Sequence, residues 1–209
     1  MNKTFLNLAA AAAMLMGASG AHAVVYTFNA TLSGANEVLP AVGGPGSGIA
    51  ILAYNTWGTA SLADDSYDFS MAVFGLTGGT VAGTAASAFH IHGAATTTEN
   101  APVRVALDAS PFAALNLGST LLVGGSAIPA PVSIPLTAVS ATNAGHPSMS
   151  FLDMLQGGLA YINVHTALKP MGAVRGQLIQ VSAVPEPSTY AMLLLGVAAL
   201  GFVARRRQR

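Results

Sequence analysis

The sequence predicts an all-β protein, an antiparallel β-sandwich with one short helix, and two features predict it. Apolar and polar residues alternate in short runs, as in Tyr26-Thr27-Phe28-Asn29-Ala30-Thr31-Leu32, which is the pattern of a half-buried strand. Groups of Gly and Pro separate these runs and are typical of turns. Short strands at regular spacing indicate a sandwich or a barrel. We favour the sandwich because no repeat period and no up-and-down strand order is visible.

The predicted strands follow one another from residue 26 to residue 181 without a dividing linker, so we expect one domain over residues 24–183. After the first strand they cover residues 48–54, 67–71, 88–92, 103–107, 119–123, 132–136, 159–165 and 173–181. One short helix is predicted over residues 151–156. Ser148 or Ser150 would cap its start, and Gly157 would provide a left-handed end.

Residues 1–23 have the composition of a removable signal peptide. Lys3 precedes an apolar run, and Ala21-His22-Ala23 gives the small-x-small pattern after which signal peptidase cuts. The cleavage signal is therefore Ala21 and Ala23, and the mature protein is expected to begin at Val24.

Residues 184–209 resemble a sorting tail. Pro185-Glu186-Pro187 precedes an apolar stretch over residues 190–204, and Arg205, Arg206 and Arg207 follow. As a helix this stretch would rise about 22 Å, at ~1.5 Å per residue, against a hydrocarbon core of ~30 Å. We predict a short transmembrane helix with its arginines on the cytoplasmic side, and residues 24–183 outside.

Composition excludes two classes of site. Residues 24–183 hold three basic and seven acidic residues, a net charge of −4, so nucleic-acid binding is not supported. The chain has no cysteine, which excludes thiol catalysis and cysteine metal ligands.

Three histidines form the candidate functional site. His90 and His92 lie two apart in a predicted strand and therefore share one face of it. His165 lies in a second predicted strand, on the same face as Tyr161 and Asn163. If the two strands are neighbours, the three imidazoles converge on one point and suit copper or zinc. The alternative is structural, with the rings bonded to the backbone and to Asn163.

Other charged residues give weaker patterns. Asp64, Asp65 and Asp68 lack the spacing of a calcium-binding hand, and a solvated turn explains them better. Glu37 and Arg175 are lone charges in apolar surroundings, for which a structural pair or cap is the default interpretation. His146 precedes Pro147 in a predicted loop and is expected to be exposed.

Four blocks of sequence resemble the CHRD domain, a module named after chordin. They are Leu32-Ser33-Gly34-Ala35-Asn36-Glu37-Val38-Leu39-Pro40, Phe89-His90-Ile91-His92-Gly93, Tyr161-Ile162-Asn163-Val164-His165-Thr166 and Gly172-Ala173-Val174-Arg175-Gly176-Gln177-Leu178. The resemblance implies an immunoglobulin-like sandwich and an extracellular setting, but no reaction. The family usually has a second Pro at Leu39 and Glu or Gln at Ala173. The short His-x-His strand is also similar to the copper-binding strand of copper/zinc superoxide dismutases.

The tail resembles the PEP-CTERM sorting signal of Gram-negative bacteria that make exopolysaccharide. The resemblance implies processing by an exosortase, a transpeptidase-like membrane enzyme. The tail implies the exosortase, the inner membrane before processing and the exopolysaccharide matrix as partners, and the N-terminal signal implies signal peptidase.

Three functions are compatible with these features. The leading hypothesis is a non-enzymatic protein of the periplasm, cell surface or extracellular matrix that binds copper or zinc through His90, His92 and His165. The rival is a superoxide dismutase-like or hydrolytic metalloenzyme that uses the same histidines. A polysaccharide-binding module ranks last, because Trp57 is the single tryptophan and no aromatic platform is visible.

Overall fold

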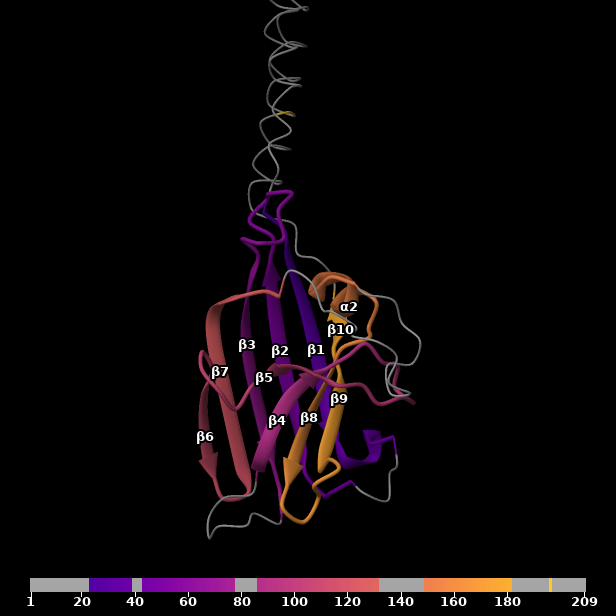
Figure 1. Ribbon diagram of the computed structural model, residues 1–209. Coiled ribbons are helices and arrows are strands. Elements are labelled where there is room, and N and C mark those ends of the chain that lie inside the picture. The colour runs from indigo at the N-terminus through magenta and orange to yellow at the C-terminus, as the bar shows by residue number, and fades with distance from the viewer. Residues whose placement is uncertain (1–22, 39–42, 78–85, 132–148, 182–195, 197–209) are drawn as a thin grey trace, which may run out of the picture.

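The computed structural model describes residues 23–38, 43–77, 86–131, 149–181 and 196 (Figure 1). The elements are β1 (Val25–Ser33), the 3-10 turn η1 (Gly34–Asn36), β2 (Ser47–Asn55), β3 (Ser66–Phe74), β4 (Ala86–His92), β5 (Val103–Ala106), β6 (Ala113–Leu117), β7 (Thr120–Pro129), α2 (Phe151–Gln156), β8 (Tyr161–Thr166), β9 (Val174–Gln177) and β10 (Ile179–Val181). The all-β class and the short helix are confirmed.

The strands form one antiparallel sheet that curls on itself. Their order is β5-β4-β8-β9-β1-β2-β3-β7-β6, and β10 also pairs with β1. In Figure 1 the half that contains β4, β8 and β9 lies in front of the half that contains β1, β2 and β3. Two facing halves agree with the predicted sandwich. The immunoglobulin-like form would divide them into two separate sheets, whereas here the hydrogen-bonded order is continuous from one half to the other.

A glycine permits the junction between the two halves. β9 joins β1 through the pair Ser33 and Arg175, and Gly176 follows directly. A Cβ at Gly176 would lie 2.7 Å from the carbonyl oxygen of Thr31, which is closer than side chains approach a backbone oxygen. The missing Cβ therefore lets β9 approach β1 closely enough to continue the sheet.

The core fills the space between the two halves. Phe28, Leu32 and Leu52 from one half and Ile91 and Ile162 from the other are completely buried in one cluster. The helix α2 adds Phe151 to it, and the ring of Phe151 lies 5.5 Å from that of Tyr67. Because one face of each strand supplies this core, the opposite face is left for other contacts.

The end of α2 corrects one detail of the prediction. Ser150 caps the helix, with a capping box to Asp153, as one of the two predicted caps. Gly157, however, has φ −71°, and its N–H still donates to the carbonyl of Asp153 in the helical pattern. The left-handed residue is Gly158, with φ 64°, because the chain completes one more helical residue before it reverses.

Two further differences concern the strands, and one predicted strand is not tested. β6 was not predicted, because Ala113–Leu117 lacks a clear alternation of polar and apolar residues. The predicted strand over residues 173–181 divides into β9 and β10. The predicted strand over residues 132–136 lies outside the described residues.

The three neighbouring aspartates have structural partners. Asp64 accepts a hydrogen bond from the Thr59 hydroxyl, Asp65 accepts one from the Tyr54 hydroxyl, and Asp68 accepts one from the backbone N–H of Ala127. These bonds fix the β2–β3 turn and the β3–β7 pairing. A turn therefore explains this cluster, as the sequence indicated, but Asp65 is 2 % exposed and so is not solvated as predicted.

The terminal signals fall largely outside the description. Residues 1–22, including Ala21, and residues 182–195 and 197–209, including Pro185, Glu186, Pro187, Arg205, Arg206 and Arg207, are not described; Ala23 is the first described residue. Within the described part of the chain, no helix is long and apolar enough to cross a membrane.

Candidate metal centre

Pairing of β4 with β8 brings the three histidines to one face of the sheet. His92 lies opposite Tyr161, His90 opposite Asn163, and Ala88 opposite His165. The small side chain of Ala88 leaves space for the imidazole of His165 to lean toward His90. Phe89, Ile91, Ile162 and Val164 point to the core instead. The predicted parity of both strands and their adjacency are therefore present in the structure.

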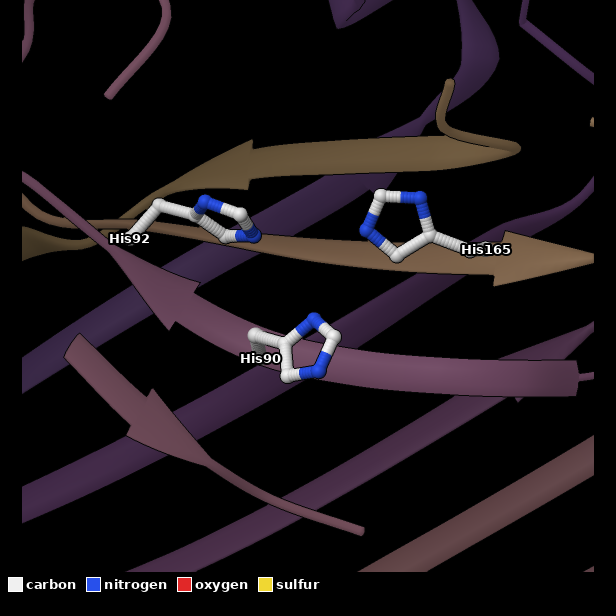
Figure 2. Close-up of side chains that lie close together, drawn as sticks. All are labelled: His90, His92 and His165. Carbon is white, nitrogen blue, oxygen red and sulfur yellow. The ribbon is translucent and has the colours of Figure 1, made fainter. Parts of the chain in front are cut away.

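The three rings lie close together, and small side-chain movements would bring all of them within reach of one ion. One ligand atom of each imidazole lies within 4.8 Å of those of the other two. The ring centre of His90 is 5.6 Å from that of His92 and 5.6 Å from that of His165, and His92 and His165 are 6.1 Å apart. Figure 2 shows one nitrogen of each ring directed toward the space between the three. An ion about 2.0–2.1 Å from each nitrogen would fit among them after small side-chain adjustments.

Backbone carbonyls fix the orientation of two rings. The Nδ1–H of His92 donates to the carbonyl of Ala101 at 2.9 Å, and that of His165 donates to the carbonyl of Pro170 at 3.1 Å. A carbonyl can only accept, so each Nδ1 carries the proton and each Nε2 keeps its lone pair. Imidazoles that bind metals are usually held in this way by a second group.

Two nitrogens at the centre of the cluster have no hydrogen-bond partner in the described part of the chain. Nδ1 of His90 and Nε2 of His92 are buried and have no hydrogen-bond partner among the described residues. Nε2 of His92 is an acceptor by the argument above. A buried polar atom without a partner costs about 1–3 kcal/mol. A cation bound by these nitrogens would remove that cost.

Burial keeps two of the rings neutral. The pKa of His92 is lowered to about 4, mainly by burial and also by the neighbouring imidazoles and Arg175, whereas the bond to Ala101 opposes the shift. Burial also lowers the pKa of His165. Both rings are therefore uncharged at neutral pH, and only the uncharged ring can bind a metal ion.

A stack of side chains supports His92 from behind. Its ring lies parallel to that of Tyr161, with centres 5.0 Å apart and an angle of 11°. The guanidinium of Arg175 lies 3.5 Å from the centre of the Tyr161 ring. Since Tyr161 lies on the strand between those of His92 and Arg175, its ring is held between the two groups.

The segment between β4 and β5 covers this face. Arg175, which is 1 % exposed, donates to the carbonyl of Thr96 and to Oδ1 of Asn100. The Tyr161 hydroxyl donates to the carbonyl of Ala101 and accepts from its N–H. The segment thus brings the carbonyl of Ala101 to His92, and Arg175 is a structural anchor of the site rather than a lone charge.

Glu37 lies beside this network in a confined position. It is 5 % exposed, accepts from the Asn163 amide at 3.5 Å, and has its Oε1 without a partner among the described residues. Gly172 has φ 131°, which other residues rarely adopt, and a Cβ there would lie 2.5 Å from that oxygen, so glycine is favoured at this position. Burial raises the pKa of Glu37 to about 7, although the charge of Arg175 and the Asn163 amide oppose the shift.

This shift predicts a pH dependence of stability. The carboxyl has an ordinary pKa of 4.5 and a folded pKa of about 7, so the folded state holds its proton more tightly. Its contribution to stability is complete below about pH 4.5 and is lost as the pH rises to about 7. In metal-free protein, we expect the melting temperature of Glu37→Gln minus that of the wild type to increase over this range. Parallel melting curves for the two proteins would contradict the assignment.

A separate cleft of about 650 Å³ lies beside Glu37 and Arg175. Its polar lining includes Asn36, Glu37, Arg175 and Gln177, and Ile179 and Val181 add apolar surface. None of the three histidines lines it. The cleft therefore adjoins the network around Arg175 and does not lead to the histidine cluster.

Sequence reasoning found the three histidines but not the groups that orient them. Ala101 and Pro170 act through backbone carbonyls, which carry no signal in a sequence. Asp108 lies near His90, with 3.8 Å between Oδ2 and Nε2. Asp108 lies two residues after Ala106, which pairs with His90, so both are expected on the same face as His90. The sequence shows this only once β5 is known to pair with β4. His146 and the sorting residues lie outside the described part of the chain.

The sequence blocks that contain these residues decide the family. The family model described as the CHRD domain matches residues 28–178, which is most of the chain. This chain belongs to the CHRD domain family. The match contains the whole histidine cluster, Glu37 and Arg175.

A second family model matches the C-terminus of the CHRD protein. The PEP-CTERM protein-sorting motif covers residues 183–207, as the resemblance of the tail implied. This motif indicates an exported protein handled by an exosortase-type sorting system. Searches of curated proteins and of solved structures give no significant match.

Proposed function

We propose that this CHRD protein is a non-enzymatic component of the cell surface or extracellular matrix that binds copper or zinc through His90, His92 and His165. A signal peptide ending at Ala23 and a sorting tail with a transmembrane helix would deliver it there. One observation carries the metal-binding part of the proposal. Three imidazoles from two adjacent strands bring their ligand atoms within 4.8 Å of one another, and two of them are oriented by backbone carbonyls.

The chemistry of the ligands supports copper or zinc. Neutral imidazole nitrogens suit both metals, whereas calcium and magnesium require oxygen ligands. Three protein ligands leave a further coordination position for water or another molecule. The rival function, a superoxide dismutase-like or hydrolytic enzyme, would use that position for its substrate.

The surroundings of the histidines favour binding over catalysis. The cleft of about 650 Å³ is lined by none of the three histidines, so a substrate held in it would not reach a metal ion bound by them. A metal held on the outer face of the sheet suits a role in storage, cohesion or partner binding.

The test uses the exported protein recovered from the cell surface. We expect about one copper or zinc ion per chain by elemental analysis, and no turnover of superoxide or of ester substrates. Peptide mapping of the same material should lack the residues that follow Pro187 if the tail is processed. Protein that takes up neither metal when either is supplied would refute the metal site, and turnover that requires the metal would favour the enzyme.

A further inference from the structure

We propose that Asp108 is a positioning residue for the histidine cluster: its carboxylate accepts the Nε2–H of His90 and so turns the Nδ1 lone pair of His90 toward His92 and His165. The inference rests on the proposed metal-binding function and adds the third orienting group of that site.

The first observation is that two of the three imidazole rings are oriented by a backbone carbonyl and the third is not. His92 and His165 each donate an Nδ1–H to a backbone carbonyl. His90 has no such bond, and its Nδ1 is buried without a partner among the described residues. Its Nε2 is therefore the nitrogen left to carry the proton if Nδ1 is to bind a metal ion.

The second observation is the placement of Asp108. Its Oδ2 lies 3.8 Å from Nε2 of His90, and the side chains are 33 % and 19 % exposed. This distance exceeds a hydrogen bond by less than 1 Å, so a small rotation of either side chain closes it. Among the described residues this is the acidic group that forms an ion-pair contact with the cluster.

The backbone holds Asp108 in this position. Ala106 of β5 pairs with His90, and the N–H of Leu107 donates to the carbonyl of Phe89 at 3.0 Å. Asp108 follows directly, on the same side as Ala106. The strand pairing that presents His90 on β4 therefore also presents the carboxylate beside it.

The carboxylate would act on metal binding in two ways. As an acceptor it selects the tautomer of His90, and as an anion it offsets the charge of an ion whose three ligands are neutral. Outer groups of this kind typically change metal affinity by about 10- to 100-fold.

Two variants of the full chain, purified in mild detergent, separate the two effects. Asp108→Asn keeps an acceptor oxygen but loses the charge, whereas Asp108→Ala loses both. Nitrogen-15 NMR of labelled histidine in metal-free protein should show His90 with Nε2–H in the wild type and in Asp108→Asn, and a mixture of tautomers in Asp108→Ala. Zinc affinity, measured by competition with a chelator, should fall about 10- to 100-fold in Asp108→Ala and less in Asp108→Asn.

The control is Asp64→Ala, which removes a carboxylate that bonds Thr59 in the β2–β3 turn. It should change neither the tautomer nor the zinc affinity. An unchanged His90 tautomer, or unchanged zinc affinity, in Asp108→Ala would overturn the role of Asp108 while leaving the metal site intact. If the wild type binds no zinc, the proposed function fails, whereas the tautomer of His90 in metal-free protein still tests the contact with Asp108.

Discussion

Replacing His92 by phenylalanine is expected to reduce zinc or copper affinity by about 100- to 1,000-fold. A four-ligand zinc site provides ~10–16 kcal/mol, or about 2.5–4 kcal/mol per ligand, and each 1.4 kcal/mol corresponds to a tenfold change. His92 is the most buried of the three histidines, at 9 % exposure, and the bond to Ala101 turns its Nε2 toward the proposed ion position. Competition titration against a chelator of known affinity measures the change.

Phenylalanine is chosen because it separates metal binding from folding. The ring retains the parallel contact with Tyr161, and the carbonyl of Ala101 still accepts the Tyr161 hydroxyl. The metal-free variant should therefore melt close to the metal-free wild type, and added zinc should stabilise the wild type alone. The control, His146→Ala, should bind normally. Wild-type affinity in His92→Phe would show that His92 is not a ligand.

Replacing Arg175 by methionine is expected to cost about 2–5 kcal/mol of unfolding free energy. Methionine keeps much of the apolar stem but removes the donors to Thr96 and Asn100 and the charge above Tyr161. Each acceptor left without a donor costs about 1–3 kcal/mol, and a buried charge network loses more when one partner is removed. Urea unfolding followed by far-ultraviolet circular dichroism gives the value.

The same change should also weaken metal binding indirectly. Arg175 anchors the segment that carries Ala101, so its loss should increase hydrogen exchange of residues 94–101 and free the ring of His92. Arg175→Lys keeps the charge but loses the planar guanidinium group. Its free energy of unfolding should therefore lie between those of the wild type and Arg175→Met. The control, Lys169→Met in the β8–β9 turn, should change stability by less than about 0.5 kcal/mol. A loss below 1 kcal/mol in Arg175→Met would show that the network is not structural.

Much of the fold follows from alternation alone. Phe28, Leu32 and Leu52 point inward because strand side chains alternate, and the sequence shows this directly. β6 and the division between β9 and β10 were missed, because a short edge strand and a close approach at Gly176 depend on the neighbouring strands. The continuity of the sheet is likewise a property of which strands pair, which no local pattern contains.

By itself, the sequence determined the all-β class, the family and the identity of the three histidines, because strand parity and motif order are local properties of the chain. Tertiary structure decided which nitrogens of those rings face one another, since the orienting groups come from Ala101, Asp108 and Pro170. It also decided that Arg175 is buried against Tyr161. Contacts between distant segments set both outcomes, and such contacts exist only after the strands have paired.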